Sequence, residues 1–82
     1  MKKTEMLIAV EDYLSVKGIT LDDFYSVGVK PSKILLQGHF QNDITRKIGT
    51  GEFAVMPTGY VETNFSVTPE NNDPINVQIT LT

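Results

Sequence analysis

The chain has 82 residues, of which 40% are hydrophobic and 21% charged, with a formal net charge of −3 and no cysteine. This composition is that of one folded domain over residues 1–82 and is too apolar for disorder. The lack of cysteine excludes disulfides and thiolate metal sites. The longest uncharged apolar run near the N-terminus, Met6 to Val10, is too short for a signal peptide or a membrane span. We therefore expect a cytoplasmic protein with no membrane partner.

Residues 5–17 have the spacing of an amphipathic helix. Apolar residues recur there at i, i+4, i+7 and i+8, which places them on one face. Gly18 follows and suits the left-handed position that ends a helix. We expect this helix to pack by one face, made of Met6, Val10, Tyr13 and Leu14, with Lys17 extending the row.

The segment 18–33 carries two conflicting patterns. Thr20 to Asp23 is a loose capping box, which is a signal for the start of a second helix. The residues that follow, from Tyr25 to Val29, alternate between larger and smaller side chains, which is strand periodicity. We favour a strand at about 24–30. A turn at Pro31–Ser32 follows, because proline fixes φ and cannot donate to a strand ladder.

The stretch from Ile34 to Gly49 is predicted to be one strand–helix unit. A strand covers 33–41, and a short helix begins at Asn42 or Asp43 and ends at Gly49. Strand alternation divides the first part into two faces. The core face has Ile34, Leu36, Gly38 and Phe40, and the other has Lys33, Leu35, Gln37, His39 and Gln41.

The last third of the chain is predicted to be β. A short strand around Phe53 and Val55 is followed by a turn, a return strand at 60–65 and a loop at 66–74. Residues 75–82 alternate strictly between apolar and polar, so one face is buried and the other meets water. The predicted order is α-β-β-α-β-β-β. It indicates an α+β two-layer sandwich, a mostly antiparallel sheet with both helices on one face.

The sequence lacks a constellation for catalysis. His39 is the only histidine, and no Ser or carboxylate partner for it can be identified, so we predict no catalytic residue and no enzyme activity. Short acidic or amide clusters at 22–23 and 71–73 lack the spacing of calcium loops, so we predict no metal and no cofactor. A small ligand binder or enzyme centred on His39 remains an alternative, because His39 lies close to a predicted helix N-terminus.

Nucleic-acid binding is disfavoured. The open sheet face has no Phe or Trp for base stacking, and the chain has no clustered basic field. A DNA-binding regulator with a helix-turn-helix-like segment at residues 20–37 is a second alternative, with Gly28 as the turn glycine. Pro31 and Gly38 interrupt its recognition helix, and only Lys30 and Lys33 are available for basic contacts.

The open polar face is the remaining functional feature. A flat face of amide and hydroxyl side chains is able to hydrogen-bond a protein partner or a second copy of the chain. The terminal strand, 75–81, would pair with another chain if it lay at a sheet edge. The predicted interaction surface consists of Gln37, His39, Gln41, Arg46, Lys47, Asn76, Gln78 and Thr80.

Three short motifs resemble those of small uncharacterised bacterial and phage-associated α+β proteins. They are LQGHF before a short helix, GYVE, and a chain end in VQITLT, and the similarity covers roughly residues 33–48, 59–62 and 75–82. The resemblance implies no activity and no site residue. Together with the open face, it favours a non-enzymatic interaction or accessory domain encoded by a phage or mobile element.

Overall fold

The computed structural model describes residues 2–82, apart from the side chain of Asn42. The predicted order of helices and strands and the α+β class are confirmed, and two single turns of 3₁₀ helix, η1 and η2, are added. The elements are α1 (Lys3–Ser15), η1 (Leu21–Asp23), β1 (Ser26–Lys30), β2 (Lys33–Gly38), α2 (Asn42–Ile48), η2 (Thr50–Glu52), β3 (Ala54–Val55), β4 (Val61–Val67) and β5 (Ile75–Leu81).

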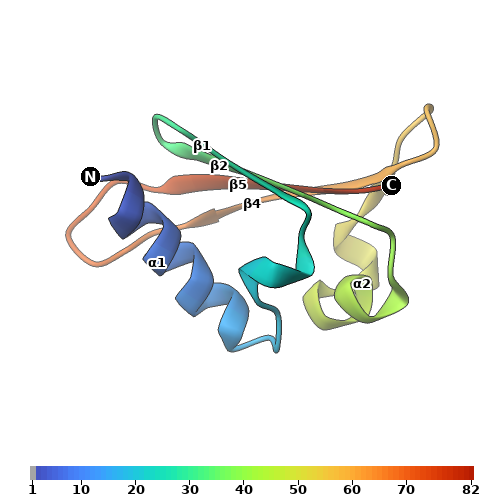
Figure 1. Ribbon diagram of the computed structural model, residues 1–82, viewed down its shortest axis with the longest axis horizontal. Helices are drawn as coiled ribbons and strands as arrows, with labels where there is room; N and C mark the ends of the chain where they lie inside the picture. The colour runs from blue at the N-terminus through green and yellow to red at the C-terminus, as the bar shows by residue number, and fades with distance from the viewer. Residues whose placement is uncertain (1) are drawn as a thin grey trace.

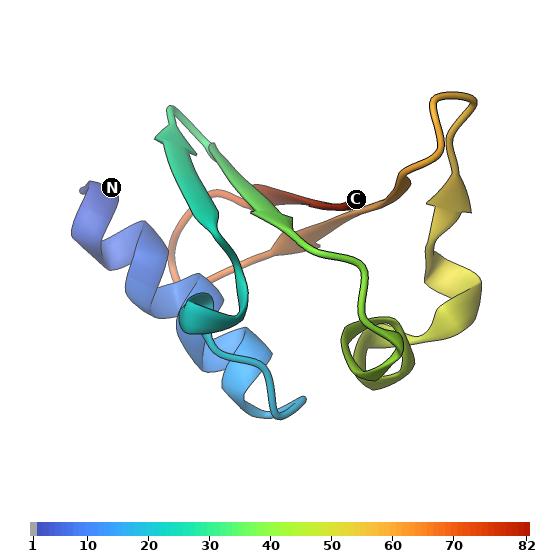
Figure 2. The same cartoon turned by 45° about the vertical axis from the view of Figure 1, so that its right-hand side comes forward.

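Within residues 2–82, five strands form one sheet in the order β1-β2-β5-β4-β3. The β2–β5 pair is parallel and the other three pairs are antiparallel, so the predicted mostly antiparallel sheet is confirmed. Figure 1 and Figure 2 show α1 and α2 below the sheet in both views. Neither described helix has the length and apolarity that crossing a bilayer requires.

The hydrophobic core lies between the sheet and the helices. β5 stands at its centre, because Val77 lies beside Ile34 of β2 and Phe65 of β4, and directly opposed residues share a face. The strict alternation of β5 is thus matched by burial at every second residue. The buried apolar residues are Met6, Val10, Leu14, Ile19, Phe24, Ile34, Leu36, Ile44, Ile75, Val77, Ile79 and Leu81.

The predicted end of the first helix is confirmed. Gly18 has φ of +77°, a conformation that costs other residues a Cβ clash. Its N–H donates to the Ser15 carbonyl at 3.0 Å, and the Ile19 N–H donates to the Leu14 carbonyl at 3.0 Å. These bonds form a Schellman motif, which turns the chain so that Ile19 packs in the core beside Leu14.

The helix-turn-helix alternative for residues 20–37 is wrong. The segment holds the single turn η1 and the hairpin β1–β2. The predicted capping pair does form, since the Thr20 N–H donates to Asp23 Oδ2 at 2.9 Å, but the turn ends at Asp23. Strand pairing then continues from Ser26 to Lys30, so the strand periodicity of this segment prevails over its capping signal.

The assignment of Phe40 to the core is also wrong. β2 ends at Gly38, and Phe40 is 50% exposed, with its N–H donating to the Thr82 carbonyl at 2.8 Å. A Cβ on Gly38 would lie 3.1 Å from the ring of Phe24, which is buried. Phe24 therefore supplies the large aromatic side chain at this end of the core.

The terminal strand does not lie at a sheet edge. β5 has β2 on one side, paired over Asn76–Leu81, and β4 on the other, paired over Ile75–Leu81. Its backbone groups are therefore used within the sheet, and pairing of residues 75–81 with another chain, which required an edge position, is excluded in this fold.

Candidate functional site on the uncovered face of the sheet

The face of the sheet opposite the helices is bare. In Figure 1 and Figure 2 no helix lies above β1, β2, β5 or β4. Alternation along the strands and the register between them fix which side chains belong to this face. We call these residues the open face: Ser26, Gly28 and Lys30 of β1, Lys33, Leu35 and Gln37 of β2, Asn76, Gln78 and Thr80 of β5, and Glu62, Asn64 and Ser66 of β4.

Hydrogen bonds fix an acidic group on the open face. Gln78 Nε2 donates to Glu62 Oε1 at 2.8 Å, in partly buried surroundings, and Asn64 Nδ2 donates to Glu62 Oε2 at 3.2 Å. Glu62 thus has one carboxylate oxygen held by Gln78 of the neighbouring strand β5 and the other by Asn64 of its own strand. A charge held in one place loses little conformational entropy when a partner binds to it.

Two lysines lie at the other end of the open face. Lys30 and Lys33 are directly opposed at the end of the β1–β2 hairpin, Lys30 exposed and Lys33 half-buried. Like charges directly opposite one another destabilise a sheet. Lys33 shares its row with Asn76 and Ser66, whereas Glu62 shares its row with Thr80 and Gln37. The open face is therefore positive at one end of its strands and negative at the other.

The middle of the open face contains one large apolar side chain. Leu35 is half-buried and stands between Gly28 of β1 and Gln78 of β5. A Cβ on Gly28 would be 3.6 Å from the Leu35 Cβ, so Leu35 borders a position without a side chain. The result is a small apolar centre surrounded by amides, hydroxyls and the two charged ends.

The predicted interaction surface is divided into three groups of residues. Four of its residues lie together on the open face, and a fifth and sixth lie just beyond the end of β2. The remaining two lie on α2, below the sheet. The first group is Gln37, Asn76, Gln78 and Thr80, the second is His39 and Gln41, and the third is Arg46 and Lys47.

The two α2 cations are engaged within the molecule. Arg46 forms an ion pair with Asp43, three residues earlier in the same helix. Lys47 Nζ donates to the Gly18 carbonyl at 3.0 Å, which links α2 to the end of α1. These two side chains belong to the helix layer and cannot act together with the open face on one flat partner.

His39 is exposed and lies beside one aromatic ring. Its ring centroid is 5.0 Å from that of Tyr25, with the rings tilted by 44°. Tyr25 is itself 57% exposed, so the pair forms an exposed aromatic corner at the end of β2. In the part of the chain that the structure describes, no three His, Asp or Glu side chains are grouped as a metal site.

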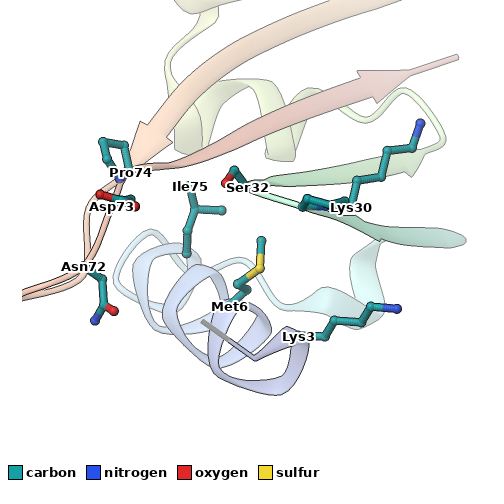
Figure 3. Close-up of a pocket in the computed structure, with 9 residues that line it drawn as sticks. Lys3, Met6, Lys30, Ser32, Asn72, Asp73, Pro74 and Ile75 are labelled. Atoms are coloured by element: carbon teal, nitrogen blue, oxygen red, sulfur yellow. The ribbon is translucent and has the colours of Figure 1, made fainter.

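Figure 3 shows a hollow of about 360 Å³ at the lysine end of the sheet, on the helix side. Met6 and Ile75 point toward one another across it, and Asp73 lies in the loop that borders it. The Lys30 ammonium is directed away from Met6, so Lys30 and Lys3 do not converge on one point. The hollow is therefore a depression with a mixed polar and apolar lining and without a focused charge.

A second hollow, of about 420 Å³, lies near α2 and β3. It contains two of the exposed large apolar side chains, Phe40 and Val55, the latter 80% exposed. Phe53 and Val61 complete its apolar wall, and Arg46 borders it. The Phe40 ring, which was predicted to lie in the core, thus lines a surface depression.

Several residues of the open face were missing from the predicted surface. Strand alternation predicts Lys33 and Leu35 on this face, but the predicted interaction surface does not include them. Glu62 follows from alternation along β4 once Val61 and Thr63 face inward. The proximity of Glu62 to Gln78 depends on β4 and β5 being neighbours, which alternation alone does not show.

No protein-family model, curated protein or solved structure matches this chain.

Proposed function

We propose that the protein is a non-enzymatic binding domain that holds a folded protein partner against its open face. The observation that carries the proposal is the bare face of the sheet, on which polar side chains are in register over four strands. A surface with a small apolar centre and a polar rim has the anatomy of a protein–protein interface.

The charges of the open face define the chemistry of the partner. A carboxylate from the partner placed between Lys30 and Lys33 would relieve their mutual repulsion. A basic group of the partner would meet Glu62, which Gln78 and Asn64 already hold in position. Charge complementarity of this kind fixes the orientation of a complex and speeds association. The partner is therefore a protein with a flat polar surface, acidic at one end and basic at the other.

We place this binding domain in the setting implied by its resemblance to phage-associated proteins, as a cytoplasmic accessory protein of a phage or mobile element. The genes that flank this one test the setting, since a neighbourhood of unrelated housekeeping genes would contradict it.

Affinity capture followed by reconstitution tests the binding proposal. The tagged wild type is used to capture proteins from its own cells, in parallel with Lys33→Glu and Leu35→Glu. A partner on the open face is retained by the wild type and lost by both variants. The purified partner should then bind Lys33→Glu at least about tenfold more weakly in calorimetry, because a favourable charge pair becomes a repulsive one.

Lys2→Glu is the matched control, because Lys2 is an exposed lysine at the N-cap of α1, outside the open face, and the change in net charge is the same. It should capture as much partner as the wild type. In a titration followed by NMR, the purified partner should shift amide signals of β2 and β5 and leave those of α1 unchanged. Equal capture by Lys33→Glu and the wild type, or shifts confined to α1, would refute binding at the open face.

A further inference from the structure

We propose that two copies of the chain pair through the free edge of β4. The two β4 strands run antiparallel about a two-fold axis that passes beside Phe65, and the two five-stranded sheets become one continuous sheet. The surface involved is the edge of β4 rather than the open face.

β4 is paired on one side only over most of its length. Toward β5 the ladder runs from Val61 to Val67. Toward β3 it covers Val61 and Glu62 alone, because β3 has two residues. We call residues 63–67 the β4 edge. An unpaired strand edge is a template for a further strand.

The hydrogen-bonding direction along the β4 edge follows from β5. Asn76 and Thr82 donate their N–H groups to Ser32 and Gly38 on the β2 side, at 3.0 Å in each case. Even-numbered residues of β5 therefore face β2, and odd-numbered ones face β4. The antiparallel register then turns the N–H and C=O groups of Asn64 and Ser66 outward.

These outward groups are self-complementary. With Phe65 opposite Phe65 of the second copy, Asn64 lies opposite Ser66 of the second copy and Ser66 opposite Asn64. Both pairs are of the hydrogen-bonded kind, and the Phe65 pair is of the close, non-hydrogen-bonded kind. Antiparallel ladders alternate in this way, so the register is regular at the axis and on both sides of it.

Phe65 gives the interface an apolar centre. Its side chain is half-buried and stacks on Tyr13 of α1, with the ring centroids 5.1 Å apart. Across the axis the two Phe65 rings would meet, so that four aromatic rings form a row on the helix side. Cross-strand aromatic pairs are among the more stabilising side-chain pairs of a sheet.

The length and charge of the edge also fit a second copy. Of the five residues of the β4 edge, Thr63 is only 3% exposed, so both copies offer mainly the four from Asn64 to Val67, before the loop that follows β4. None of these five is charged or a proline, the devices by which edges are usually protected. The other edge strand, β1, contains Gly28 and Lys30, which weaken pairing.

Sedimentation equilibrium tests the proposal with the complete chain. Because five paired residues make a small interface, the dimer belongs to the weak class, and loading concentrations of about 10 µM to 1 mM are needed. The wild type should show a reversible monomer–dimer equilibrium. Ser66→Pro removes an outward N–H that β5 does not use. Because of the two-fold symmetry, the dimer loses two hydrogen bonds, one from each copy. Its dissociation constant should rise about tenfold or more.

Ser66→Ala is the matched control, because it keeps the backbone N–H, and it should dimerise like the wild type. Lys33→Glu on the open face should also leave the dimer unchanged, which separates this proposal from the proposed function. In the wild type, amide exchange at Asn64 and Ser66 should slow as the concentration rises. Three results would overturn pairing through the β4 edge. They are a wild type that stays monomeric, an undiminished dimer in Ser66→Pro, and exchange at these amides that does not depend on concentration.

Discussion

Leu36 and Phe40 lie four residues apart in the sequence and were predicted to share one buried face, but the structure separates them. Leu36 is fully buried, whereas Phe40 is half-exposed beyond the end of β2. Leu36→Ala should therefore lower the free energy of unfolding by about 2–5 kcal/mol. Phe40→Ala should lower it by roughly 1–2 kcal/mol, since part of the ring is already in water. Urea denaturation of both variants checks this, and equal losses would show that Phe40 is buried after all.

The position of Phe40 shows what alternation can and cannot predict at the scale of residues. Alternation assigned Ile34 and Leu36 correctly, because both lie inside the strand. It failed at Phe40, because β2 ends at Gly38, where the buried ring of Phe24 packs close against the glycine. That contact is between the segment before β1 and the end of β2. It cannot be predicted from the residues next to Phe40 in the sequence.

The ends of helices and strands depend on the backbone conformation of single residues, which substitutions can test. Gly18 at the end of α1 is the clearest example. A Cβ added there meets Lys47 only at ordinary contact distances of 3.7 Å or more, so the φ of +77° is the main cost. Gly18→Ala should destabilise the fold by about 1–2 kcal/mol. The measurement is the midpoint of thermal unfolding followed by circular dichroism at 222 nm.

Gly51→Ala is the control for that substitution. Gly51 is exposed, a Cβ there would meet nothing within 4 Å, and its φ is not in the left-handed range. The substitution should be neutral or slightly stabilising, since alanine reduces the entropy of the unfolded chain. A loss at Gly51 as large as that at Gly18 would contradict the conformational explanation.

Element types were predictable here because apolar spacing and glycine positions are local signals. The strict alternation of residues 75–82 and the helical spacing of Met6, Val10 and Leu14 are both found in the structure. The strand order was not predictable, since β5 pairs with β2, about forty residues earlier in the chain. The charged ends of the open face and the free β4 edge were not predictable for the same reason, because both depend on which strands are neighbours.

At the scale of the whole molecule, β5 joins two halves that otherwise share no strand. β1 and β2 lie on one side of it, and β4 and β3 lie on the other. Both halves and both helices contribute to one core cluster. The two proposed binding surfaces also depend on β5, because it sets the register of the open face and the outward direction of Asn64 and Ser66.

Disruption of β5 on its core side should therefore unfold the whole chain rather than one end of it. Val77 is 1% exposed, and Val77→Asp would place a carboxylate between the sheet and α1, at a cost of several kcal/mol. A domain of this size has a total stability of about 5 kcal/mol. The helical signal at 222 nm and the near-ultraviolet signal of the three tyrosines should disappear together. Asn76→Asp, one residue earlier and exposed on the open face, should keep both signals, because its side chain meets water on the opposite side of the strand. Loss of the tyrosine signal with retention of helix in Val77→Asp would mean that the two halves fold separately, and that β5 does not make the chain one cooperative unit.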